Sequence, residues 1–156
     1  MWTESGEIKS ALTELNLNWI TLAPLEAAEV TNKVVARFTE GGKYSYPLWE
    51  HLNAFTGVVK EFAWEWFEQL LNDKQVVLFF EKDDDKTVFF LKDGSEIVKV
   101  MNNSTRMTFY VSNLDADFLY AYHSDHSIFR VCGSARVGFK EFVKKSKLDE
   151  QLTDWH

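Results

Sequence analysis

The sequence has little of the chemistry that cross-links a protein or anchors it in a membrane. Its one cysteine, Cys132, excludes an internal disulfide and a cysteine-based zinc site, and we expect it to be buried in a strand. Residues 1–7 contain no basic stretch followed by an apolar run, and the longest apolar run, residues 76–80, is too short to cross a bilayer. These absences predict a protein of the reducing cytoplasm, neither secreted nor inserted in a membrane.

Positive charge is also scarce. The chain has 17 Lys and Arg against 24 Asp and Glu, which gives a net charge of −7 with neutral histidines. Because such a chain repels a phosphate backbone at long range, nucleic acid is not the expected partner. The one basic stretch, residues 130–147, has Glu141 as its only acidic side chain. We expect it to form a solvated face near a helix C-terminus, where cations suit the helix dipole.

Aromatic side chains are in excess. They make up 15% of the 156 residues, with 13 Phe, 6 Trp and 5 Tyr, and the hydrophobic fraction is 46%. A chain of this size buries a full core without metal or disulfide support. Tryptophan that does not fit a core tends to lie at interfaces, so the excess favours recognition of a partner. With no repeat and no linker, we expect a single domain over residues 1–156, with a polar tail from about residue 147.

Hydrophobic periodicity predicts helices in the N-terminal half of the chain. The expected helical segments are residues 3–15, 24–38, 47–52 (a short turn) and 58–72. In the last of these, Phe62, Trp66 and Leu70 form one apolar stripe. Residues 19–22 are expected to be extended, and the two glycines in residues 40–45 predict a loop.

The C-terminal half changes to β-type residues. The expected strands are residues 76–80, 87–91, 107–112, 118–122 and 127–132. Residues 95–101 fit either a helix or a strand, and we favour a helix capped by Ser95. A final helix is expected to end near Lys145, and the tail has Trp155 as its one apolar anchor. The prediction is an α+β fold with a mostly antiparallel sheet of about five strands in the C-terminal half, helices in the N-terminal half and one C-terminal helix.

The best local candidate for chemistry is the run His123-Ser124-Asp125-His126, which holds two imidazoles around a carboxylate. Histidine and aspartate bind divalent metals, and histidine shuttles protons near neutral pH. Between two strands the same residues also make an ordinary turn, which is the reading we favour. A thiol–imidazole pair with Cys132 lacks any signal for an oxyanion site, so we expect no catalytic residue, no metal and no cofactor.

A second candidate is a ligand pocket around Trp49-Glu50-His51, in the segment after the glycine loop. An aromatic wall with a few polar groups is typical of such pockets, although a turn that closes one end of the core has the same composition. The phosphate-binding, nucleophile-elbow and dinucleotide motifs do not occur in the sequence.

Acidic side chains gather in the expected loops. Asp83, Asp84 and Asp85 occupy one turn, and the later loops hold Asp115, Asp117 and Asp125. If these loops share one edge of the sheet, they form a single acidic surface that attracts a basic partner.

The second half of the chain resembles a group of small bacterial proteins. The resemblance lies in residues 89–91 (FFL), 93–94 (DG), 108–113 (TFYVSN), 117–126 (DFLYAYHSDH) and 131–133 (VCG). These segments are similar to ones in small α+β proteins that include immunity proteins of polymorphic toxin systems. The resemblance implies a cytoplasmic, non-enzymatic and often acidic protein that masks the active face of a toxin.

The leading hypothesis is therefore an acidic, non-enzymatic binding protein of the immunity type. Its partner is expected to be a protein, such as a basic toxin domain, which the acidic loops attract and which Tyr122 contacts as an aromatic anchor. One alternative is a small metal-dependent or His/Asp-based hydrolase, or a ligand-binding enzyme, centred on His123, Asp125 and His126 or on Trp49, Glu50 and His51. Another is a homo-oligomeric structural protein whose surplus tryptophans form the subunit contact.

Overall fold

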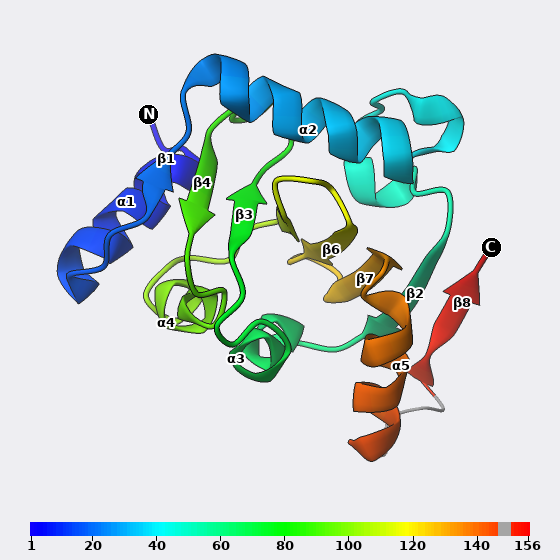
Figure 1. The fold of residues 1–156 in the computed structure, drawn as a ribbon. Coiled ribbons are helices and arrows are strands. Elements are labelled where there is room, and N and C mark those ends of the chain that lie inside the picture. Colours follow the sequence, from blue (N-terminus) through cyan, green and yellow to red (C-terminus); the bar gives the residue numbers. More distant parts are fainter. Residues whose placement is uncertain (147–150) are drawn as a thin grey trace.

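An eight-stranded antiparallel sheet forms the centre of the protein in the computed structural model, which describes residues 1–146 and 151–156. The strands are β1 (Ile20–Thr21), β2 (Phe55–Val59), β3 (Val76–Phe79), β4 (Val88–Leu91), β5 (Phe109–Ser112), β6 (Phe118–His123), β7 (Ile128–Gly133) and β8 (Thr153–Trp155). Their order across the sheet is β1-β4-β3-β5-β6-β7-β2-β8 (Figure 1).

Helices cover both faces of this sheet. The α-helices are α1 (Glu4–Leu15), α2 (Pro24–Phe38), α3 (Phe67–Leu70), α4 (Glu96–Asn102) and α5 (Arg136–Lys145). Three short 3-10 turns join them to the strands: η1 (Glu40–Gly42), η2 (Leu48–Glu50) and η3 (Ala63–Trp66). α2 and η2 pack on one face, whereas α1, α3, α4 and α5 pack on the other (Figure 1).

Strand β3 shows why the core has two halves. Val76 and Leu78 point into the cluster that contains α1, α3 and α4, and Val77 and Phe79 point into the cluster that contains α2. All four side chains are buried because successive residues of a strand face opposite sides and both sides are covered. The continuous apolar run therefore gave a correct prediction of a doubly covered strand.

The predicted helix over residues 58–72 is wrong. Residues 55–59 form β2 and pair with β7, and Phe62 then adopts a left-handed conformation with φ of 58°. Helical structure resumes only in η3 and α3. The apolar stripe is consequently broken, and the Phe62 side chain is 43% exposed. The physical reason is that β-branched Val58 and Val59 find a partner strand distant in the sequence, which local periodicity does not reveal.

The prediction of about five strands confined to the C-terminal half is also wrong, although the α+β class is right. β1, β2 and β8 add to the five expected strands, and two of them come from the N-terminal half. β1 lies within residues 19–22, which were expected to be extended, but its two residues, like the three residues of β8, are too few for an alternating pattern to mark a sheet strand. β8 pairs with β2, and the Asp154 carboxylate forms ion pairs with Arg136 and Lys140 of α5.

Other local predictions have mixed outcomes. Residues 96–102 form a helix as favoured, but the Ser95 hydroxyl donates to the Asp93 carboxylate and does not cap the helix. Trp155 is 56% exposed, so it is not a buried anchor for the tail. The start of the expected tail, residues 147–150, lies outside the described residues. Within the described residues, no helix combines the length and apolar character needed to cross a membrane.

The strand register decides which loops meet. Phe79 at the end of β3 pairs with Tyr110 near the start of β5, and Phe109 pairs with Tyr122 near the end of β6. The loop after β3 and the turn after β6 therefore leave the sheet at the same end, which we call the cleft end. The turn between β5 and β6, residues 113–117, lies at the opposite end.

Candidate functional site

A cleft of about 430 Å³ opens at the cleft end of the sheet. Five separate parts of the chain surround it: the N-terminus, the segment through η2, the loop after β3, the segment before β5 and the turn after β6. Its principal lining residues are Trp2, Glu4, Tyr46, Trp49, Glu50, Glu81, Asp84, Thr108, His123, Asp125 and His126. The two candidate pockets of the sequence, around Trp49 and around His123, are thus one site.

A buried carboxylate holds the η2 segment in place. Glu81, 4% exposed at the end of β3, accepts hydrogen bonds from the Tyr44 hydroxyl (2.6 Å), the Leu48 N–H (3.0 Å) and the Tyr110 hydroxyl. The Tyr110 hydroxyl in turn accepts a hydrogen bond from the backbone N–H of Trp49 at 3.1 Å. Burial raises the pKa of Glu81 above its ordinary value, and the hydrogen bonds from the tyrosines oppose that shift.

The Trp49 indole forms a flat wall of the cleft. Its ring stacks on the His123 imidazole, with centroids 4.4 Å apart and planes inclined by 23°. The Arg130 guanidinium lies 5.2 Å from the indole and donates to the Trp49 carbonyl at 2.6 Å. The indole is 8% exposed, yet its buried N–H has no hydrogen-bond acceptor among the described residues. A buried donor without an acceptor is costly, so this N–H is an unsatisfied polar group in the wall of the cleft.

The histidine pair lies beside this wall. The Nδ1 atom of His123 is 3.0 Å from the Thr108 hydroxyl, and the His123 and His126 rings are 5.3 Å apart. Burial lowers the pKa of His123 below 6.5, with the nearby His126 adding to the shift and Asp125 opposing it. His123 is therefore mainly neutral at physiological pH. His51 does not contribute to the cleft lining.

Carboxylates dominate the charge of the cleft. Five acidic side chains line it, from Glu4, Glu50, Glu81, Asp84 and Asp125, and its described lining contains no Lys or Arg. The Tyr46 hydroxyl contacts the Asp84 carboxylate at 3.4 Å. Partial burial raises the pKa of Glu4, and the neighbouring charges of Asp84 and Asp85 raise it further. This arrangement attracts a cation, whose binding relieves the repulsion among the carboxylates.

The acidic residues predicted to share one surface do not all meet. Asp84 and Asp125 line the cleft, and Asp83 is exposed beside it. Asp85 instead accepts the N–H groups of Ser5 and Thr87.

Asp115 and Asp117 belong to the turn at the opposite end of the sheet. There Asp117 accepts from the Asn113 side chain and lies 3.8 Å from Arg37. The condition for a single acidic surface is therefore not met, because successive antiparallel turns alternate between the two ends of a sheet.

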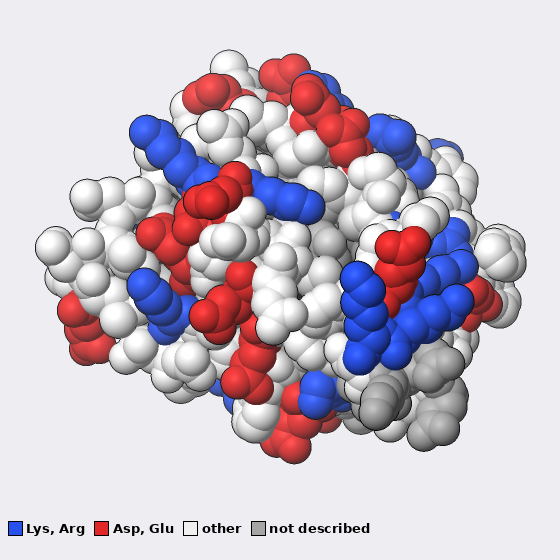
Figure 2. All heavy atoms as spheres, turned by 60° about the horizontal axis from the view of Figure 1, so that its bottom comes forward, with Lys and Arg blue, Asp and Glu red and all other residues white. Residues whose placement is uncertain are grey.

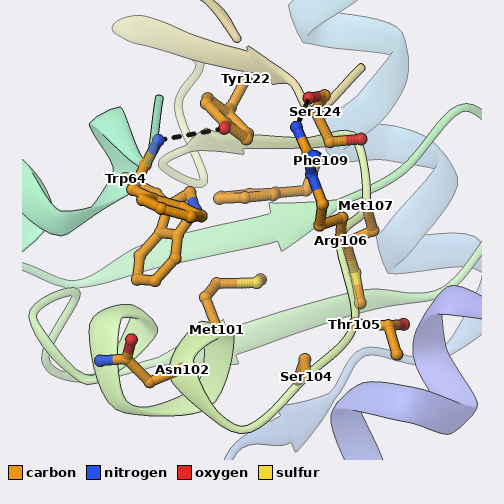
Figure 3. A pocket seen from close by; sticks show the side chains of 11 residues that line it. Trp64, Met101, Asn102, Ser104, Thr105, Arg106, Met107, Phe109, Tyr122 and Ser124 are labelled. Carbon is orange, nitrogen blue, oxygen red and sulfur yellow. Dashed lines mark hydrogen bonds between the residues drawn. The ribbon is translucent and has the colours of Figure 1, made fainter. Parts of the chain in front are cut away.

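Tyr122 lines a second, smaller hollow of about 190 Å³ on the other side of Met107, which contributes to both spaces. Figure 3 shows Trp64, Met101, Phe109 and Tyr122 around this hollow, with Arg106 donating to the Ser124 carbonyl at its rim. The Tyr122 hydroxyl accepts a hydrogen bond from the Phe62 N–H at 3.4 Å. Because Tyr122 is 3% exposed, it is a core residue and does not present the exposed ring expected of a partner anchor.

Basic side chains gather elsewhere. Figure 2 shows Lys and Arg concentrated over α5, which contributes Arg136, Lys140, Lys144 and Lys145. Lys144 and Lys145 occupy its last turn, as the sequence predicted for a basic face near a helix C-terminus. The basic surface and the acidic cleft are thus built on different elements.

The described residues contain no group of three or more His, Cys, Asp or Glu side chains placed to hold a metal ion. Cys132 is buried on β7, and burial raises the pKa of its thiol to about 12, which suppresses the nucleophilic thiolate. The residue pattern carries no signal for Thr108 and Glu4 as site residues. Only Glu81 had a signal, since it follows an apolar strand directly. Comparison of the chain with protein-family models, curated proteins and solved structures finds no match.

Proposed function

We propose that this protein is a non-enzymatic acidic binding protein of the immunity type. It receives a cationic side chain of a basic partner protein in the cleft beside Trp49, and its bulk then covers the active face of that partner. The observation that carries the proposal is the cleft itself. It combines five carboxylates, a described lining without Lys or Arg, and a buried indole N–H that lacks an acceptor.

Each of these parts matches a different feature of a basic peptide segment. Carboxylates at the rim, such as Asp84 and Asp125, pair with a guanidinium or ammonium group. The Trp49 side chain, whose ring already contacts His123 and Arg130, gives an apolar surface for the methylene groups of that cationic side chain. The indole N–H lacks an acceptor but is buried, so the Trp49 side chain must shift before a main-chain carbonyl of the same segment can accept from it.

Electrostatics also supports capture of a basic partner. The net charge of −7 and the acidic cleft steer a cationic protein toward this end of the sheet. A basic toxin domain of the cytoplasm fits both the charge and the single cysteine. The charge and the cleft give no support for a nucleic-acid partner.

The proposal is tested on the protein encoded by the neighbouring gene, with association rates measured at low and high salt. The cleft variant combines Asp84→Asn and Asp125→Asn, which remove two exposed carboxylates from the lining. The matched control combines Asp115→Asn and Glu68→Gln, two exposed positions outside the cleft lining. Both variants change the net charge by the same amount.

We expect the cleft variant to associate more slowly and with a weaker salt dependence, and the control to behave as the wild type apart from a small long-range effect. Thermal stability should stay nearly constant in both, because exposed charges contribute little to folding. Equal effects of the two variants on association would contradict the assignment of the cleft.

A second candidate function, a His/Asp-based hydrolase or ligand-binding enzyme, has one observation in its favour. His123, His126 and Asp125 line the same cleft, and the Thr108 hydroxyl contacts Nδ1 of His123. Metal analysis of purified protein separates the two candidates. One equivalent of tightly bound zinc that is lost in His123→Ala would favour the enzyme and overturn the binding proposal.

The homo-oligomeric alternative has a feature of its own, since Trp2 is 55% exposed and Trp155 is 56% exposed. Exposed tryptophans of this kind are frequent at subunit contacts. A mass measurement in solution decides the matter. Under our proposal the protein without its partner is a monomer, and a stable oligomer that dissociates in Trp155→Ser would favour the alternative.

A further inference from the structure

A third cavity lies under the first half of α2 and takes no part in the proposed function. Its volume is about 500 Å³, within the roughly 300–1,000 Å³ of pockets that hold small molecules. One wall is the face of α2 that carries Ala27 and Ala28. The other walls come from Leu22 and from Phe79 and Phe80 at the end of β3. We call this cavity the α2 groove.

The groove exists because α2 carries small residues where it passes over the sheet. Pro24, Ala27, Ala28 and Thr31 follow one another at intervals of three, one and three residues, which places them on one face of the helix. Phe79, 3% exposed, packs beneath it on the α2 side of the sheet. Ala28 itself is exposed, so a larger side chain there would extend into the groove without displacing the core.

The polar end of the groove is cationic. Lys82 and Lys86, both exposed, line it, and neither has a carboxylate within ion-pair distance in the part of the chain that the structure describes. The Lys82 ammonium lies 4.5 Å from the centre of the Tyr44 ring. The lining also includes Asp85, whose carboxylate already accepts the N–H groups of Ser5 and Thr87.

The first turn of α2 adds to this positive character. The positive end of the helix dipole points the same way. Pro24, in that first turn, lines the groove, whereas Glu26 of the same turn does not.

From the apolar walls and the cationic end together, we propose that the α2 groove binds a medium-chain carboxylate. The hydrocarbon chain lies between Ala27 and Ala28 of α2 on one side and Leu22 and the phenyl group of Phe79 on the other. The carboxylate lies at Lys82 and Lys86, near the positive end of the α2 dipole. A cationic or uncharged head would find no partner there, and an anion without a chain would leave the apolar walls exposed to water.

The test is calorimetric titration of the full-length protein with decanoate, acetate and decyltrimethylammonium. Decanoate should bind with one-to-one stoichiometry, and the other two compounds should not saturate a site. Ala28→Phe, which fills the groove, should abolish decanoate binding. Ala36→Phe, another exposed position on α2 outside the groove lining, is the matched control and should bind as the wild type.

Neutralising the cationic end gives an independent check that does not disturb the walls. The double variant Lys82→Met and Lys86→Met should weaken decanoate binding about tenfold, the product of two modest charge contributions. The control Lys43→Met, at an exposed lysine outside the groove lining, should leave it unchanged. Absence of saturable decanoate binding, equal binding by Ala28→Phe, or equal binding of the cationic amphiphile would each overturn the proposal.

Discussion

Replacing Glu81 by glutamine tests how the cleft is built, because this carboxylate holds the segment that carries Trp49. The wild-type carboxylate accepts from Leu48 N–H with both oxygens and from the hydroxyls of Tyr44 and Tyr110. Glutamine keeps one acceptor oxygen and turns an NH₂ group toward the remaining donors. Tyr44 is partly exposed and can turn to water, whereas Tyr110 is fully buried.

The buried Tyr110 hydroxyl therefore loses its carboxylate acceptor and faces the NH₂ group of the glutamine, which is also a donor. Each such group costs about 1–3 kcal/mol, so we expect Glu81→Gln to lower the free energy of unfolding by roughly 2–3 kcal/mol near neutral pH. Urea unfolding measures this change. Glu50→Gln makes the same chemical change at an exposed carboxylate of the same cleft, and should stay within about 0.5 kcal/mol of the wild type.

The pH dependence of the free energy of unfolding shows whether ionisation of Glu81 stabilises or destabilises the folded protein. Because burial raises the pKa of Glu81 in the folded state above 4.5, folding favours the protonated form of this group. Its contribution to stability is largest below the unfolded-state pKa and falls as pH rises through the raised folded-state pKa. The stability advantage of wild type over Glu81→Gln should therefore shrink across that range. A variant as stable as the wild type, or an advantage that grows with pH there, would refute the role given to Glu81.

Three further predictions concern the core, the histidine and the thiol. Phe79→Ala should cost about 3–5 kcal/mol in urea unfolding because Phe79 is 3% exposed, whereas Phe62→Ala, at a side chain 43% exposed, should cost less than about 1 kcal/mol. The pKa of His123, followed by NMR, should lie below 6.5. Its contribution to stability is therefore present above pH 6.5 and is lost as pH falls through the lowered pKa. A titration midpoint above 6.5 would contradict the burial of His123 against Trp49. Cys132, with a thiol pKa of about 12, should react with an aromatic disulfide reagent only at the rate of unfolding, and immediate reaction in native buffer would contradict its burial.

Local sequence patterns predicted those parts of the fold that local physics decides. α1 and α2 have apolar faces at helical spacing, and β3 is a short continuous apolar run, so their positions followed from the sequence. β2 was missed because its stability comes from pairing with β7, some seventy residues later, while the same residues also fit a helical stripe. β8 is only three residues long and depends on Asp154 reaching the cations of α5.

The candidate site likewise combines residues that the local sequence suggests with an arrangement that depends on distant strand pairing. The sequence suggested Trp49, Glu50, His123 and Asp125 by residue type, but in two unrelated clusters. Their union depends on β3, β5 and β6 lying side by side, which brings the loop after β3 and the turn after β6 to one end of the sheet. Tyr122 was assigned to a partner contact because an aromatic strand residue next to a turn does not reveal which face it occupies.

The central claim, that the cleft beside Trp49 accepts a cationic side chain, is tested most directly on the Trp49 indole N–H. Its NMR resonance is identified by its loss in Trp49→Phe and followed during titration with the capped tripeptide Gly-Arg-Gly. The same tripeptide with citrulline, which has nearly the same shape and no charge, serves as the control. The account predicts a saturable shift of the Trp49 resonance with the arginine peptide and a far smaller one with citrulline. No shift with arginine, or equal shifts with both peptides, would contradict it.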